Sequence, residues 1–133
     1  MYHAVSQGAL AIEVRAEDQA AIELCRKISH WETAWTCTAE RACLRVLEGG
    51  CSVPVGVASE LVQGENTHVL KLTGCVTSMD GRSHVEYTLE DKVESLDDAE
   101  GKGVKLAKIL LEAGAKGILD EIKADRQRKM AMQ

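Results

Sequence analysis

The sequence predicts an α+β fold in which helices cover one face of a small, three-stranded antiparallel sheet. Three observations predict it. Residues 17–48 repeat apolar side chains at helical spacing, residues 53–89 alternate short β-rich runs with turn sequences, and residues 97–123 return to helical spacing. Because short turns join the strands, we expect neighbouring strands to run antiparallel and the flanking helices to pack on the sheet.

The first predicted elements are a short strand and a helix. Residues 9–14 form an apolar run typical of a buried strand, and residues 17–29 have helical spacing with acidic side chains at their start. A buried strand needs neighbours in a sheet. We therefore expect residues 1–30 to be the closing strand and helix of a neighbouring α/β domain whose remainder lies upstream. A boundary near residues 29–32 separates them from a second unit, residues 31–133.

A second helix is expected over Thr33–Glu48, after a break at Trp31–Thr33. Its apolar face comprises Trp35, Ala39, Ala42, Cys43 and Val46. Glu40 and Arg41 are interpreted as part of its solvated face rather than as an acid–base pair. The pair Gly49-Gly50 follows, and glycine reaches the positive φ that ends a helix at little cost.

Three strands are expected next. Val53–Ala58 is short and β-branched, Glu60–Leu72 reads as a hairpin with its turn at residues 63–66, and Val85–Leu89 forms the third strand. The turn at Met79–Arg82 contains Asp-Gly, which tolerates the positive φ of hairpin turns. The middle of the chain is therefore predicted to be a small antiparallel sheet.

The last predicted helix spans Asp97–Ala113. Gly114 interrupts it, and helical spacing resumes over Ala115–Lys123. The remaining tail, residues 124–133, is charged and is expected to fray.

Composition excludes several classes of function. The 133 residues carry a net charge of −5, which argues against a nucleic-acid-binding protein and against a protein that binds anionic membranes. No apolar run approaches the roughly 20 residues that span a bilayer, and the N-terminus lacks the pattern of a signal peptide. We expect a cytoplasmic protein that is monomeric.

The cysteines are odd in number and lack metal-site spacing. They are Cys25, Cys37, Cys43, Cys51 and Cys75. The absence of a CxxC pair gives no support for zinc, so no metal ligand is predicted, and free thiols are expected in a reducing compartment.

Cys51 stands apart because it follows Gly49-Gly50 and precedes the only proline. It comes after the end of a helix, where the macrodipole is negative and does not lower a thiol pKa. Glycines leave the loop accessible, however. The local sequence therefore leaves two interpretations open, a covalent anchor and an incidental loop thiol, and it favours the second.

Four segments carry a resemblance to a known family. They are QGALAIE at 7–13, AERACLR at 39–45, LEGGCSVPVG at 47–56 and LAKILLEAGA at 106–115. In this order they resemble the porphobilinogen deaminases, also called hydroxymethylbilane synthases, over nearly the whole chain. That family has three domains. The resemblance implies that this chain holds the end of the first domain and all of the third, with Ser6 and Ala11 where the family commonly has glycine.

The resemblance also implies the chemistry. Cys51 corresponds to the cysteine that holds a dipyrromethane cofactor through a thioether, Gln7 to a glutamine near the cofactor, and Gly50 to a residue beside the thioether. Four porphobilinogen molecules are condensed head to tail on this primer with release of ammonia, as a step of haem biosynthesis. The catalytic aspartate and the cationic substrate-binding residues lie upstream in the family, so no catalytic residue is assigned and the chain is expected to be inactive alone.

Two alternatives belong to other classes. The chain could be a non-enzymatic interaction module, or a truncated gene product that pairs with a separate N-terminal part. In the enzyme that the resemblance implies, porphobilinogen and the growing pyrrole chain are expected to be contacted through the domains that this sequence lacks.

Overall fold

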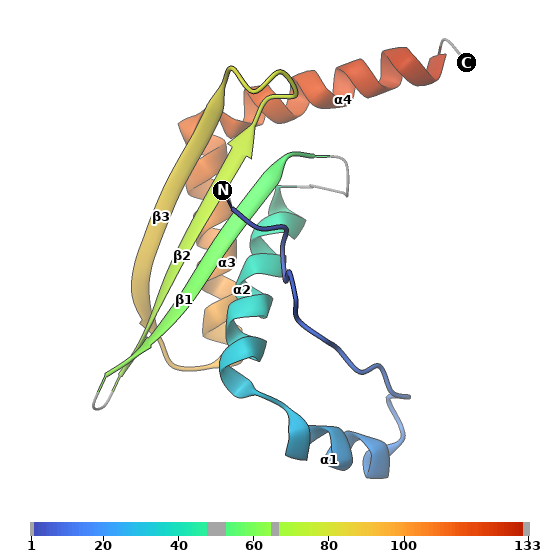
Figure 1. Cartoon of the computed structure of the whole chain (residues 1–133), viewed down its shortest axis with the longest axis vertical. Coiled ribbons are helices and arrows are strands. Elements are labelled where there is room, and N and C mark those ends of the chain that lie inside the picture. The colour runs from blue at the N-terminus through green and yellow to red at the C-terminus, as the bar shows by residue number, and fades with distance from the viewer. Residues whose placement is uncertain (1, 48–52, 65–66, 132–133) are drawn as a thin grey trace.

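The computed structural model of the chain describes residues 2–47, 53–64 and 67–131. The elements are α1 (Gln19–Ile28), α2 (Trp31–Val46), β1 (Val55–Gln63), β2 (His68–Thr77), β3 (His84–Val93), α3 (Leu96–Leu110), a π-helical turn (Leu111–Ala115) and α4 (Lys116–Ala131). The strands form one antiparallel sheet in the order β1-β2-β3. Helices α2 and α3 cover one face of it (Figure 1). The predicted α+β class and three-stranded sheet are confirmed.

The core lies between this sheet face and the two helices. β2 is the central strand, and its side chains Leu70, Leu72 and Val76 are at most 1% exposed. The cluster comprises Ala39, Cys43, Leu47, Leu70, Leu72, Val76, Leu89, Val93, Ala99, Leu106, Ala107, Leu110, Ala115 and Leu119. Its members are small and aliphatic, and all lie after α1.

Two glycines allow the layers to approach closely. A Cβ atom placed on Gly103 of α3 would lie 2.0 Å from the carbonyl oxygen of Ala39 in α2. A Cβ atom on Gly74 of β2 would lie 2.8 Å from Cδ1 of Leu110. Both distances are shorter than real Cβ contacts, so α3 approaches the backbone of α2 at Gly103, and the Leu110 side chain packs on the β2 backbone at Gly74.

The predicted break at Trp31–Thr33 is wrong, because these residues form the first turn of α2. The His30 ring nitrogen Nδ1 accepts a hydrogen bond from the Thr33 amide and satisfies a donor at the helix start. The rings of Trp31 and Trp35 then pack edge to face with their centroids 4.9 Å apart, and the His68 ring lies 5.0 Å from Trp31. This contact joins α2 to the start of β2.

The sheet strands are longer than predicted. β1 continues to Gln63 instead of stopping at Ala58, and it pairs with β2 along its whole length up to Gln63–His68. β3 continues to Val93 beyond the predicted end at Leu89. Each strand extends beyond its own β-branched residues because its backbone pairs with a neighbouring strand there.

The predicted strand at residues 9–14 is wrong, whereas the helix after it is confirmed. Residues 9–15 have no regular secondary structure, and Leu10 is 98% exposed. Among the described residues no strand lies beside them to pair with their backbone groups. α1 forms because the Asp18 side chain accepts a hydrogen bond from the Ala21 amide, yet none of its residues is buried.

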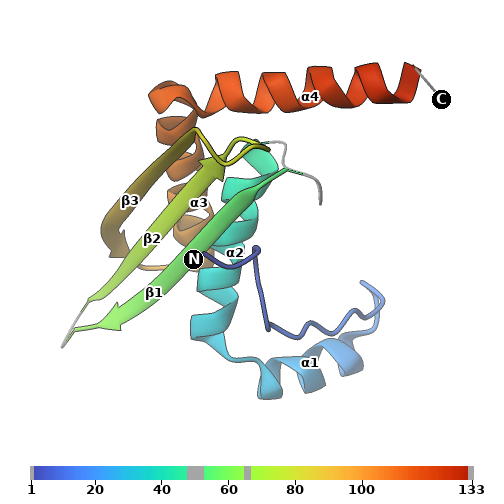
Figure 2. The same cartoon turned by 45° about the horizontal axis from the view of Figure 1, so that its top comes forward.

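The predicted fraying of the C-terminal tail is also wrong. Gly114 breaks the helix as predicted, with a φ of 114°, and α4 then runs to Ala131, away from the sheet (Figure 2). The first turns of α4 are anchored by Leu119 and Ile122, whose side chains are buried. Asp125 stabilises its last turns through ion pairs with basic residues three and four positions later, Arg128 and Lys129.

Candidate functional site

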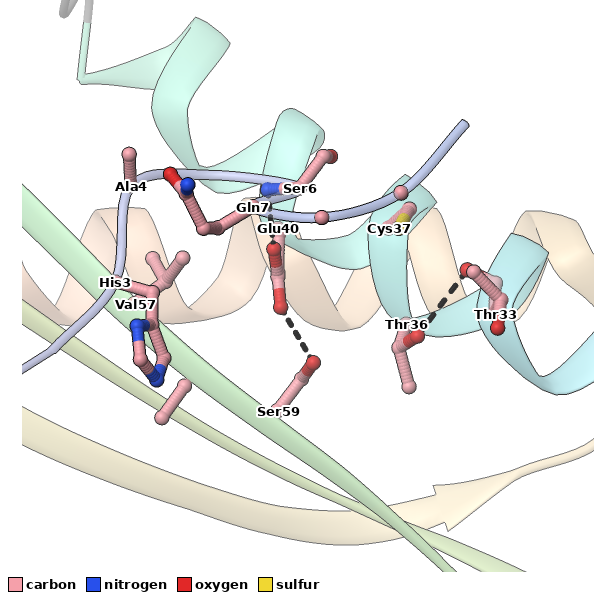
Figure 3. Close-up of a pocket in the computed structure, with 13 residues that line it drawn as sticks. His3, Ala4, Ser6, Gln7, Thr33, Thr36, Cys37, Glu40, Val57 and Ser59 are labelled. Carbon is pink, nitrogen blue, oxygen red and sulfur yellow. Dashed lines mark hydrogen bonds between the residues drawn. The ribbon is translucent and has the colours of Figure 1, made fainter. Parts of the chain in front are cut away.

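A cavity of about 570 Å³ opens between the N-terminal segment, α2 and β1 (Figure 3). Its walls come from residues between 3 and 9, from Thr33, Thr36, Cys37 and Glu40 of α2, and from residues 57–59 of β1. Its volume falls in the range of small-molecule sites, and most of its lining is polar or small.

The N-terminal segment reaches the cavity from the free edge of β1. The His3 amide donates to the Val57 carbonyl at 3.1 Å, and the Val57 amide donates to the His3 carbonyl at 2.9 Å. Tyr2 packs against Gly56, where an added Cβ would lie 2.7 Å from the Tyr2 Cβ. A hydrogen bond to Glu86 of β3 raises the pKa of Tyr2. One end of the segment is thus fastened to the sheet.

Gln7 then lies within two overlapping turns. The Gln7 amide donates to the Ala4 carbonyl and the Ala9 amide donates to the Ser6 carbonyl, both at 3.1 Å. The third residue of each turn has a positive φ, 57° for Ser6 and 81° for Gly8. Such turns favour glycine at that position, and a residue with a side chain pays about 1–2 kcal/mol there. Ser6 is the only described residue other than glycine with a positive φ.

Glu40 joins the three walls of the cavity. Its Oε2 accepts a hydrogen bond of 2.6 Å from the Ser6 amide, and its Oε1 accepts one of 2.5 Å from the Ser59 hydroxyl (Figure 3). The residue is 9% exposed. Hydrogen bonds to a charged group contribute about 1.5–3 kcal/mol each, enough to offset the backbone cost at Ser6.

The interpretation of Glu40 as a solvated residue is therefore wrong. Its partners lie 34 and 19 residues away in the chain, so helical spacing alone could not reveal them. The available signal was its place directly after the buried Ala39, at the margin of the apolar face. Ser59 carried no signal, because a serine in a strand is compatible with either sheet face.

The structure places one of the three predicted cofactor residues. Gln7 lines the cavity and is exposed. Gly50 and Cys51 lie outside the described residues. The segment that holds them is bounded by Leu47, the last described residue after α2, and by Val53 ahead of β1.

The other cysteines differ in environment. Cys43 is 0% exposed, and burial raises the pKa of its thiol to about 12, so it stays protonated and unreactive at neutral pH. Cys25, Cys37 and Cys75 are half-buried, and Cys37 lines the cavity. Within the described ranges, no three His, Cys, Asp or Glu residues come together to hold a metal ion. No helix among them is long and apolar enough to cross a membrane.

Comparison with known families gives a direct match. The family model for the C-terminal domain of porphobilinogen deaminase matches residues 34–112, more than half of the chain. The chain belongs to the porphobilinogen deaminase family. The match spans α2, the three strands and α3, which together build the core, and it includes Glu40 and Ser59 of the cavity.

Relatives in this family extend the similarity to the N-terminal segment. The chain is 48% identical to the porphobilinogen deaminase of Nostoc sp. over 95% of its own length and 37% of the relative. It is 49% identical to that of Synechococcus elongatus over 90% of the chain and 35% of the relative. For Eremothecium gossypii the identity is 47%, over 92% and 37%. The chain thus spans little more than a third of the curated relatives it matches.

The cavity is suited to one part of a pyrrole ligand. Pyrrole N–H groups need acceptors, and Gln7, whose side-chain oxygen can accept a hydrogen bond, is among the exposed lining residues. None of the lining residues is lysine or arginine. The cavity therefore fits the rings of such a ligand better than its carboxylates, which call for cationic partners.

Proposed function

We propose that this chain is the cofactor-carrying part of a hydroxymethylbilane synthase, which condenses four porphobilinogen molecules head to tail and releases ammonia. The observation that carries the proposal is the family match over residues 34–112, within which the LEGGC sequence falls. Cys51 is the proposed anchor of a dipyrromethane cofactor through a thioether, with Gly50 and Gln7 as its neighbours.

The proposed roles follow from what each residue offers. When bound, the cofactor supplies the free pyrrole position that attacks each incoming porphobilinogen as ammonia leaves. Cys51 anchors it and reacts only once, during assembly, so its thiol needs no lowered pKa. Gly50, which has no side chain, would leave room beside the thioether, and the side-chain oxygen of Gln7 would accept a hydrogen bond from a pyrrole N–H.

The remaining groups must come from outside this chain. The substrate and the growing product are polyanionic, so their carboxylates need arginine or lysine donors. The cavity lining has none, and the chain carries a net charge of −5. We propose that residues 1–30 belong to the family's first domain and residues 31–133 to its third, and that the chain alone is inactive. A cytoplasmic monomer is the proposed state of the complete protein.

A chimera tests this function. The matching part of the Nostoc relative is replaced by this chain, and hydroxymethylbilane formation is measured beside the isolated chain. We expect turnover from the chimera and none from the isolated chain. Intact and peptide mass spectrometry of the chimera should map a pyrrole adduct to Cys51, and Cys51→Ser should lose it whereas Cys37→Ser keeps it. An adduct on another cysteine, or an inactive chimera that folds, would refute the proposal.

A second candidate function is an interaction module that pairs with a separately made N-terminal part. The favouring observation is a set of exposed apolar side chains at the start of the chain. They are Leu10 at 98%, Ile12 at 62%, Leu24 at 64% and Ile28 at 67% exposed. Mixing the chain with the remaining N-terminal part of the Nostoc relative should then give a complex on size-exclusion chromatography. A complex without turnover favours this candidate, and a complex with turnover favours the enzyme.

A further inference from the structure

The buried carboxylate of Glu40 is shared between two partners from different parts of the chain. It lies at the margin of the core and forms no ion pair with any lysine or arginine that the structure describes. Its two oxygens are instead divided between Ser6 and Ser59. A buried carboxylate is unfavourable unless it is hydrogen-bonded, and these two hydrogen bonds supply its partners among the described residues.

We propose that Glu40 is the positioning residue for Gln7, and that it acts by holding the Ser6 amide. This rests on the proposed function, because it assumes that Gln7 contacts the cofactor. Ser6 is adjacent to Gln7 and forms part of both turns that shape its backbone. A fixed Ser6 amide therefore fixes the direction in which the Gln7 side chain leaves the chain.

Glu40 is expected to position the Gln7 segment, and not the reverse, because Glu40 belongs to the more rigid part of the chain. Glu40 lies on α2 next to core residue Ala39, which is 0% exposed, and Ser59 lies on β1, which is paired with β2. By contrast, Gln7, Gly8 and Ala9 are exposed. The carboxylate thus connects the packed unit of α2 and β1 to the exposed segment. Among the described residues, no other hydrogen bond joins residues 4–9 to α2.

Ser59 has a distinct part in this arrangement. Its hydroxyl donates to Oε1, which leaves Oε2 directed at the Ser6 amide. Removal of the hydroxyl keeps the charge of Glu40 but frees the carboxylate to rotate. Ser59→Ala is therefore expected to give a weaker form of the Glu40→Gln defect, since a glutamine keeps the volume but loses the charge that strengthens both hydrogen bonds.

Amide hydrogen exchange of the 133-residue chain tests the contact without any need for activity. We expect Glu40→Gln to reduce protection of the Ser6 amide at least several-fold while the amides of β2 keep theirs. Glu60→Gln, an exposed carboxylate on the same strand as Ser59, is the matched control and should leave Ser6 protection unchanged. Equal Ser6 protection in Glu40→Gln and Glu60→Gln would overturn the proposal.

A double-mutant cycle in the Nostoc chimera tests whether Glu40 acts through Gln7. We expect Glu40→Gln to lower kcat by up to about 100-fold, the loss that a displacement of about 1 Å in a positioning group can cause. In a Gln7→Ala background the same change should lower kcat less than about twofold, because nothing is left to position. The same fold loss in both backgrounds would mean a merely structural role and would overturn the proposal.

The two experiments separate this inference from the proposed function. If the unsubstituted chimera folds but makes no hydroxymethylbilane, the proposed function fails, and the exchange experiment still decides whether Glu40 holds Ser6. If the chimera is active and the cycle is additive, the proposed function stands and the positioning role fails.

Discussion

Helix α1, in residues 2–30, and helix α3, in residues 31–131, differ in the burial of their apolar side chains. α1 carries Leu24 and Ile28 at helical spacing, and they are 64% and 67% exposed. α3 carries Leu106 and Leu110 at the same four-residue spacing, and both are 0% exposed. Figure 1 shows the reason, because α3 lies against the sheet whereas α1 lies past the start of α2, away from the sheet.

The difference teaches that an amphipathic pattern predicts a helix but not its burial. The spacing is a property of a single segment, whereas burial needs a second apolar surface at the correct distance. The N-terminal segment is fixed by other means, at Tyr2 and His3 on β1 and at Ser6 on Glu40. Hydrogen bonds hold most of the N-terminal segment in place, whereas apolar packing between the helices and the sheet holds the rest of the chain together.

The largest expected effect is a loss of stability in the core between the sheet, α2 and α3. Leu106→Ala removes a side chain that is 0% exposed in the centre of the core, so it should lower the free energy of unfolding by about 3–5 kcal/mol. Leu24→Ala makes the same chemical change on exposed α1 and should cost less than about 0.5 kcal/mol. Urea unfolding of both variants measures the contrast. Equal losses would show that α1 is buried in solution.

Two glycines in α3 sharpen the same contrast within one helix. A Cβ on Gly103 would meet the Ala39 carbonyl at 2.0 Å, so Gly103→Ala should cost about 1–3 kcal/mol or more through overpacking. A Cβ on Gly101 would have nothing within 4 Å. Gly101→Ala should then stabilise the protein by up to about 1 kcal/mol. Thermal unfolding compares them, and a stable Gly103→Ala variant would contradict the close approach of α2 and α3.

A third pair compares backbone conformation at the two ends of the chain. Added Cβ atoms on Gly8 and Gly117 would both lie in open space, but only Gly8 has a positive φ. Gly8→Ala should lower the local opening free energy of the Gln7 turns by about 1–2 kcal/mol, whereas Gly117→Ala should stabilise α4 by about 1 kcal/mol. Amide exchange at Ala9 and Leu119 reports each effect. Unchanged protection at Ala9 would argue against the double turn.

The smallest effect is electrostatic and lies on the surface of the packed unit. Hydrogen bonds from Lys105 and Lys102 lower the pKa of Asp91 below its unfolded value, so its contribution to stability is present above that value and is lost as pH falls. Asp91→Asn should therefore lower Tm more at pH 7 than at pH 3, because the contribution of the ionised carboxylate begins to decline below the ordinary pKa of about 3.9 and disappears only below the lowered pKa of the folded state. Tm measured at both pH values decides this, and an equal loss at the two would exclude the ionised carboxylate as the cause.

The fold was predictable where a segment carries its own signal. The Asp-Gly turn, the Gly114 break and the alternating strands lie where the sequence indicates them. The strand predicted at residues 9–14 does not form in the structure, because an apolar run becomes a strand only where a neighbouring strand pairs with its backbone. The tail after Lys123 was misjudged because its charged residues are spaced to form ion pairs along a helix, such as Asp125–Lys129, and the composition of a charged tail does not reveal that spacing.

By itself, the sequence determined the α+β class, the antiparallel hairpins and, through LEGGC and its companion segments, the family. Local patterns suffice for these, because each is set by neighbours in the chain. Only the tertiary structure decided that Glu40 is buried and that it binds Ser6 and Ser59 at once. A carboxylate is solvated or buried according to what the fold brings against it, and here the fold brings residues 34 and 19 positions away.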